Sequence, residues 1–319
     1  MKRIGVLTSG GDSPGMNAAI RAVTRTAIYK GLEVIGSRRG FEGLLDGDLV
    51  PLTVSSVGGI IHRGGTVLRT ARSDRFKKPE GVREGLQRLK EYDIDAFVVI
   101  GGDGSFRGGY DLYKLGFPIV GIPATIDNDI AGTDCTIGFD TACNTALYCI
   151  QKLRDTASSH ERLFIVEVMG RHAGFLALEA AVAAGAEYVL VPERKFVLED
   201  LCEKLNYARN RGKNHTLIIV AEGVMSAAEL SAQLKDTGGY SARITVLGHI
   251  QRGGNPSSFD AVLASRLGGG AVEALLRGES GVMVGRISGK IVTHPIQYSW
   301  ENKKELDEDM MTLVEILGI

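Results

Sequence analysis

Short apolar runs rich in β-branched residues alternate along most of the chain with longer segments of helical periodicity. The run "AFVVIGG" at 96–102 has almost no polar alternation, which is typical of a strand covered on both faces of a parallel sheet. Other predicted strands lie near 3–9, 33–38, 118–124, 162–170, 188–192, 216–223 and 242–249. Predicted helices lie near 15–30, 104–115, 139–157, 172–184, 198–211, 226–236 and 257–277, before a hairpin at 281–295 and a helix from about 301. The alternation predicts an α/β fold with mainly parallel sheets, which bind ligands at the carboxyl ends of their strands.

Length and charge narrow the class of protein. A chain of 319 residues favours two domains over one core. The net charge of −1 gives no basic surface for nucleic acid or anionic membranes. Four cysteines without a CxxC pair, and no uncharged apolar run of ~18 residues, predict a cytoplasmic protein without a disulfide framework.

The string "VVIGGDGSFRGG" predicts a phosphate-binding turn. Glycines at the end of a strand let the backbone approach a phosphate, and the helix that opens at Ser105 attracts anions at its N-terminus. Asp103 would repel phosphate directly, so its plausible use is to hold Mg²⁺ against it. The alternative is a tight turn with an aspartate cap.

The first predicted strand ends in a similar turn, "LTSGGDSPGMNAA". It is not a P-loop, because the chain contains no Gly-Lys-Ser/Thr. Alone this turn is weak evidence for a phosphate site, but two such turns on separate strands of one sheet support that prediction together.

The stretch "PATIDNDIAGTD" follows the apolar run "FPIVGI" with three aspartates and no Lys or Arg. In an extended segment Asp127 and Asp129 would face the same side. Neighbouring carboxylates favour proton retention, so one could serve as a general base. An Asx-rich turn is the alternative.

Cationic residues cluster at other predicted strand ends. Such residues usually form surface salt bridges, but several near one cleft indicate an anionic ligand. They are Arg162, Arg171, Arg243, His249 and Arg252. Arg21 and Arg25 lie one helical turn apart, which alone indicates only a solvated face.

Together these strings resemble the bacterial ATP-dependent 6-phosphofructokinase family. The resemblance runs over about residues 1–278 through "IGGDGS", "TIDND", "GFDTA", "RDTASSHER", "VMGRHAG", "VLGH" and "QRGG". It implies two three-layer α/β/α sandwich domains with the active site in the cleft between them. It further implies a larger ATP-binding domain (1–138 plus 252–300), a smaller fructose 6-phosphate-binding domain (139–251 plus 301–319), and a homotetramer.

The resemblance also implies the reaction, in which MgATP phosphorylates the 1-hydroxyl of fructose 6-phosphate. Positions matching the family's ATP-binding residues are Gly11, Arg72, Ser73, Gly102, Asp103, Gly104, Ser105 and Gly108, with Asp103 as the Mg²⁺ ligand. Catalytic positions are Asp127 as proton acceptor, Thr125 and Asp129 beside it, and Arg171 and Arg72 at the transferred phosphoryl group.

Further positions match the family's sugar-phosphate and effector sites. The sugar-phosphate set is Thr125, Ile126, Asp127, Met169, Gly170, Arg171, Glu222, His249, Ile250, Gln251 and Arg252, with Arg162 and Arg243 from a neighbouring subunit. The effector set, for activation by ADP or GDP and inhibition by phosphoenolpyruvate, is Arg21, Arg25, Arg154, Gly185, Ala186, Glu187, Arg211, Lys213, Asn214 and His215.

Two positions bear on the phosphoryl donor: Ala124, which departs from the usual glycine of the family, and Gly104, which is retained. Pyrophosphate-using relatives carry Lys at the position of Ala124 and Asp at that of Gly104, so ATP is the favoured donor here. Alternative readings are a pyrophosphate-dependent enzyme and a catalytically silent nucleotide or sugar-phosphate sensor. NAD and lipid kinases share only the Gly-Gly-Asp-Gly turn.

Overall fold

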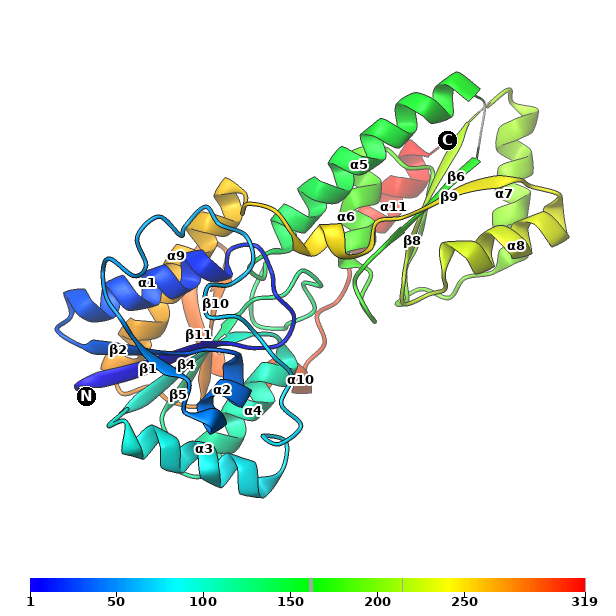
Figure 1. Cartoon of the computed structure of the whole chain (residues 1–319). Helices are drawn as coiled ribbons and strands as arrows, with labels where there is room; N and C mark the ends of the chain where they lie inside the picture. The colour runs from blue at the N-terminus through cyan, green and yellow to red at the C-terminus, as the bar shows by residue number, and fades with distance from the viewer. Residues whose placement is uncertain (161–162, 214, 319) are drawn as a thin grey trace. The chain divides into compact units, whose positions relative to one another are not determined.

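The computed structural model describes residues 1–160, 163–213 and 215–318. The chain forms two compact units, coloured along the sequence in Figure 1. Unit 1 comprises Met1–Thr141 and Arg252–Lys304, and unit 2 comprises Ala142–Gln251 and Glu305–Ile319. Among the described residues, no helix is long and apolar enough to cross a membrane.

Unit 1 contains a seven-stranded sheet. In spatial order its strands are β11 (Lys290–Pro295), β10 (Val282–Ile287), β5 (Ile119–Pro123), β4 (Ala96–Gly101), β1 (Arg3–Thr8), β2 (Glu33–Ser37) and β3 (Leu49–Leu52). From β10 to β2 neighbouring strands pair in parallel, whereas β11 and β3 pair antiparallel at the two edges. The parallel centre and the β10–β11 hairpin confirm the sequence prediction.

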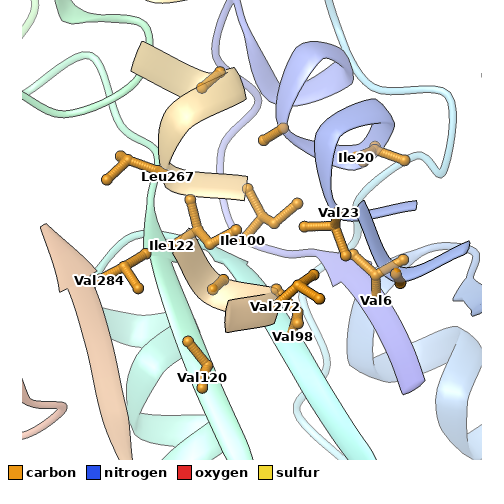
Figure 2. Packing of buried hydrophobic residues seen from close by; sticks show 14 of the residues in the cluster. Val6, Ile20, Val23, Val98, Ile100, Val120, Ile122, Leu267, Val272 and Val284 are labelled. Atoms are coloured by element: carbon orange, nitrogen blue, oxygen red, sulfur yellow. The ribbon is translucent and has the colours of Figure 1, made fainter. Parts of the chain in front are cut away.

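Helices cover both faces of this sheet, as expected for strands without polar alternation. The helices of unit 1 are α1 (Met16–Tyr29), α2 (Gly40–Asp46), α3 (Pro79–Glu91), α4 (Asp103–Lys114), α9 (Ser258–Leu276) and α10 (Tyr298–Glu301). Val98 and Ile100 of β4 face the cluster formed with α1 and α9, which Figure 2 shows from close by. Phe97 and Val99 face the opposite cluster, formed with α3 and α4. Because successive side chains of β4 point to opposite faces of the sheet, the strand contributes to both cores, and unit 1 is a three-layer sandwich.

Unit 2 has a smaller, fully parallel sheet. Its strands, in spatial order, are β7 (Tyr188–Leu190), β8 (Thr216–Ala221), β6 (Leu163–Val168) and β9 (Ala242–Val246). Its helical elements are α5 (Phe139–His160), α6 (Phe175–Ala184), α7 (Leu198–Asn210), α8 (Ala227–Gly238), η1 (Gly248–Arg252) and α11 (Glu308–Leu317). One core lies against α5, α6 and α11 and the other against α7 and α8, so unit 2 is also a three-layer sandwich. The first three residues of α5 and the last residue of η1, Arg252, belong to unit 1.

The sequence analysis missed or misplaced several elements. It did not predict α2, β3 or α3. The helix expected from about residue 301 was wrong in its start, because α10 ends at Glu301 and α11 begins at Glu308. Asp307 caps α11 by accepting a hydrogen bond from the Met310 N–H, which explains the later start.

Candidate active site

Three neighbouring parallel strands of unit 1, β5, β4 and β1, carry the predicted nucleotide and acidic loops at their carboxyl ends. The Ser9 N–H donates to the Ile100 carbonyl (3.0 Å), and the Ala124 N–H donates to the Gly101 carbonyl (3.0 Å). The loops that follow these strands therefore begin side by side at one edge of the sheet. This edge is where open α/β sheets bind ligands.

The turn between β4 and α4 has the form of an anion site. Gly102 is the N-cap of α4 and supplies no side chain to its first amides. A Cβ on Gly101 would lie 2.5 Å from the Ser9 carbonyl oxygen, so only glycine fits there. The Ser105 Oγ is buried and has no hydrogen-bond partner among the described residues. An unused hydroxyl beside the N-terminus of a helix suits a phosphate group.

Asp103 lies in the first turn of α4 with a half-exposed side chain, 3.9 Å from the Arg107 guanidinium. Within the described ranges, no group of three or more His, Cys, Asp or Glu could hold a metal ion. A divalent cation here would need oxygens from a ligand besides the Asp103 carboxylate. That set of donors fits Mg²⁺ bound together with phosphate groups. A Cβ on Gly104 would meet nothing within 4 Å, so the space beside this turn is open.

Arg252 lies in unit 1 against the turn after β1. Its Nη1 donates to the Asp12 carbonyl (3.3 Å) and lies where a side chain on Gly11 would be. The sequence analysis placed Arg252 with the sugar phosphate and Gly11 with ATP. The structure brings these two residues together.

The remaining predicted nucleotide contacts have varied surroundings. Arg72 is exposed. The Ser73 Oγ accepts a hydrogen bond from the Phe76 N–H (3.1 Å). A Cβ on Gly108 would lie 2.9 Å from the ring of Phe41, which is buried and stacks on Phe76 at 4.2 Å. Gly108 therefore lets the Phe41 ring pack closely against α4.

The segment after β5 is bent rather than extended, so the alternation assumed for its aspartates was wrong. Asn128 has a φ of 53°, which reverses the chain between them. Asp127 is 4% exposed, whereas Asp129 is exposed. Thr125 Oγ1 accepts a hydrogen bond from the Asp127 N–H (3.2 Å), while the Ile126 side chain is fully buried. The Ile126 side chain is therefore closed to a ligand, and Asp127 sits in a protected position.

In unit 2, the loop after β6 is shaped by one carboxylate. Glu222 Oε1 accepts hydrogen bonds from the N–H groups of Gly170 (3.2 Å) and Arg171 (2.8 Å). Gly170 has a φ of 142°, a conformation that favours glycine. The Met169 N–H donates to Gln251 Oε1 (3.0 Å), and Gln251 is fully buried. These contacts fix the backbone and leave the Arg171 side chain exposed.

Other predicted sugar-phosphate residues lie at the surface of unit 2. His249 and Ile250 are exposed on η1, and Arg243 is exposed on β9, the edge strand of its sheet. Arg162, also predicted for this site, lies outside the described residues.

The structure brings several predicted effector residues of unit 2 together. Arg154 Nη1 donates to the carbonyls of Ala184 and Gly185, the latter at 2.8 Å. Lys213 Nζ lies 3.3 Å from a carboxylate oxygen of Glu187, which is 5% exposed. Glu187, Arg211 and Lys213 line a cavity of about 830 Å³. The other predicted members comprise Ala186 (buried) and His215 (half-buried) in unit 2, Arg21 and Arg25 on α1 in unit 1, and Asn214, which lies outside the described residues.

Sequence reasoning missed residues that hold the loops. Asn17 is buried, accepts a hydrogen bond from the Val67 N–H (2.7 Å) and donates to the Arg63 (2.9 Å) and Gly64 carbonyls. A lone asparagine in the apolar start of a helix is the only sequence signal for this role. Lys304 anchors the Asp127 loop in a similar way, without any local signal.

Three comparisons place the chain among known proteins. The family model described as "Phosphofructokinase" matches residues 3–275. An ATP-dependent 6-phosphofructokinase of Listeria welshimeri is 56% identical over 319 residues, with full coverage of both chains. The phosphofructokinase structure of Saccharomyces cerevisiae has a TM-score of 0.87 at 37% identity, covering 99% of this chain and 46% of the yeast chain. A pyrophosphate-dependent phosphofructokinase of Marinobacter aquaeolei has a TM-score of 0.84 at 23% identity, covering 98% of this chain and 91% of that chain, and so shares the fold alone.

Proposed function

Because the chain belongs to the phosphofructokinase family, we propose that it transfers the γ-phosphoryl group of ATP to the 1-hydroxyl of fructose 6-phosphate. The products are fructose 1,6-bisphosphate and ADP. In this proposal unit 1 binds the nucleotide, unit 2 binds the sugar phosphate, and the reaction takes place in the cytoplasm.

One observation carries the proposal at the level of geometry. Asp103 and Asp127 follow the neighbouring strands β4 and β5, whose ends are joined by the hydrogen bond from Ala124 to Gly101. The loop that carries Asp103, whose carboxylate suits a cation, therefore begins next to the loop that carries Asp127, whose protected carboxylate suits proton transfer. Phosphoryl transfer needs both, together with precise positioning.

The reaction needs one proton acceptor and several donors of positive charge. The Asp127 carboxylate takes the proton of the 1-hydroxyl as its oxygen forms a bond to the γ-phosphorus, and the bond to the bridging oxygen of ADP breaks. Arg72 and Arg171 are exposed cations that can stabilise the transferred group. Asp103 would hold Mg²⁺, which would neutralise charge at the phosphates. The amide of Gly104 and the hydroxyl of Ser105, both at the start of α4, orient the phosphates.

Residues 104 and 124 support ATP over pyrophosphate as donor. No described atom lies within 4 Å of a Cβ built at Gly104, which leaves room for a larger polyphosphate. Ala124 is 1% exposed, and its methyl group adds no cation to the site.

We also propose a homotetramer in which Arg162 and Arg243 reach the sugar phosphate of a neighbouring subunit. The edge strand β9 exposes Ile244 (43%) and Val246 (57%), and Ile250 on η1 is also exposed (54%). Exposed apolar residues on an open sheet edge favour burial by another chain. Light scattering is expected to give a mass near four times the 34.1 kDa of one chain. A mass of one chain at assay concentration would contradict this arrangement.

Effector binding forms the last part of the proposal, with ADP or GDP as activator and phosphoenolpyruvate as inhibitor. Lys213 and Arg154 could bind phosphate or carboxylate groups, while the buried Glu187 among them makes the site sensitive to the charge of its occupant. Since the Lys213 amine already contacts Glu187 and the Gly318 carbonyl (2.8 Å), an occupant would compete with both partners.

A coupled assay tests the proposed function. With fructose 6-phosphate, MgATP is expected to support turnover at least about 100-fold faster than magnesium pyrophosphate, since only ATP supplies an adenosine for binding energy. ADP is expected to shift the fructose 6-phosphate saturation curve to lower concentration, and phosphoenolpyruvate to higher concentration. Equal or faster turnover with pyrophosphate would overturn the donor, and no turnover with either would overturn the activity. ADP binding without a shift of the curve would overturn the regulation.

A further inference from the structure

Lys304 is a cation for which the proposed reaction has no role. It lies on the segment between α10 and α11 and is the last residue of unit 1. Its neighbours Lys303 and Glu305 are exposed, but the Lys304 side chain turns inward. Its Nζ donates to Asn128 Oδ1 (2.8 Å) and to the Asp134 carbonyl (2.6 Å). Lys304, which lies 176 positions after Asn128 in the sequence, thus binds the loop that carries Asp127.

Asn128 connects the Lys304 amine to the rest of the loop that carries Asp127. The residue directly follows Asp127, and its φ of 53° reverses the chain at that point. Its Oδ1 also accepts from the Thr136 N–H (3.1 Å), and Thr136 Oγ1 donates to the Thr125 carbonyl (2.7 Å). Thr125 Oγ1 in turn accepts from the Asp127 N–H. A continuous set of hydrogen bonds therefore leads from the lysine to the backbone of Asp127.

The position is costly for a lysine. Burial lowers the pKa of the Lys304 amine to about 8, although Cys135, Asp134 and Asp129 act in the opposite direction. A surface lysine would avoid this cost. Loop stability alone is the simpler explanation for the contact, so a useful test must separate stability from turnover.

We propose that Lys304 is a positioning residue for the reaction, which holds the Asp127 carboxylate in place through Asn128 and Thr136. The inference rests on the proposed function, in which Asp127 accepts the proton of the sugar hydroxyl. A misplacement of about 1 Å in a reacting group can cost about 100-fold in rate.

The variant Lys304→Met tests this role, because it keeps the length of the apolar stem and removes the donor. We expect kcat to fall about 10-fold to 100-fold, while the KM values for ATP and fructose 6-phosphate change less than about threefold. Lys304→Arg, which keeps a charged donor, is expected to recover at least about a third of the wild-type kcat. Lys303→Met is the matched control, since Lys303 is exposed, and its kcat is expected to match the wild type.

Hydrogen exchange provides a readout that does not depend on turnover. Amides of residues 125–136 are expected to exchange faster in Lys304→Met, with the strands of unit 1 unchanged. Wild-type kcat in Lys304→Met would overturn the inference, as would a loss of kcat with uniformly faster exchange across unit 1. An inactive wild-type protein would instead overturn the proposed function, so the two failures are distinguishable.

Discussion

Replacing Asp127 with serine is expected to lower kcat for fructose 6-phosphate by about 10²- to 10⁴-fold, the range that a general base contributes. The Asp127 side chain is 4% exposed, and its backbone N–H donates a hydrogen bond to Thr125 Oγ1. Its carboxylate is therefore held in one position, as a proton acceptor requires. A serine hydroxyl is a far weaker proton acceptor than a carboxylate. The dissociation constant for fructose 6-phosphate, measured by equilibrium dialysis, is expected to change only a few-fold.

Asp129→Ser is the matched comparison for this experiment. Asp129 is two residues further along the same loop but exposed, and it lies beyond the reversal at Asn128. Its loss is expected to cost less turnover than the loss of Asp127. If Asp127→Ser retained more than about a tenth of the wild-type kcat, Asp127 would not be the proton acceptor.

Replacing Asp260 with alanine is expected to lower the free energy of unfolding by about 3–5 kcal/mol, because several buried hydrogen-bond donors would lose their acceptor. Asp260 is fully buried in the first turn of α9. It accepts hydrogen bonds from the Gly138 N–H (2.9 Å), the Thr141 N–H (2.8 Å) and Thr141 Oγ1 (2.5 Å). Alanine would leave these donors buried without their acceptor.

The ionisation of Asp260 does not weaken this expectation. Burial raises the pKa of its carboxyl group, while the hydrogen bonds from Thr141 and Gly138 act in the opposite direction. The group serves as an acceptor for these donors in either protonation state.

Urea denaturation, at a fixed protein concentration, measures the change in the free energy of unfolding. Asp111→Ala provides the control, because its ion pair with Lys114 is partly exposed and is expected to contribute at most about 1 kcal/mol. Equal losses for the two variants would contradict the role of Asp260.

Local patterns predicted the fold where each element satisfies its own requirements. The strand β4 was predicted because it is apolar at every position, and α1 because Pro14 precedes a helical pattern. The pattern failed for α2, whose Gly40 and Gly43 disfavour helix, and for β3, whose Pro51 disfavours a strand. Contacts with the rest of unit 1 override these propensities. The helix α3 had a readable signal, a proline at its start and an amphipathic pattern, and could have been predicted.

The candidate site was predictable only in its local parts. Asp103 and Ser105 follow a strand directly and open a helix, so their surroundings could be read from the sequence. The bend at Asn128 could not, because Thr136 and Lys304 fix it from 8 and 176 residues away. The partners of Asp260 are likewise about 120 residues distant, at Gly138 and Thr141. Long-range hydrogen bonds of this kind leave no periodic trace in the chain.

The discontinuous make-up of unit 1 has a consequence for synthesis on the ribosome. Its first stretch ends at Thr141, and its second begins at Arg252, so about 110 residues of unit 2 are made in between. At about 5–20 residues per second, roughly 7–30 s pass between the synthesis of Thr141 and the completion of α9 and β10. During that time the edge of β5 and the apolar face of α1 are uncovered. The nascent chain thus exposes an aggregation-prone surface for which a chaperone would be the natural protection.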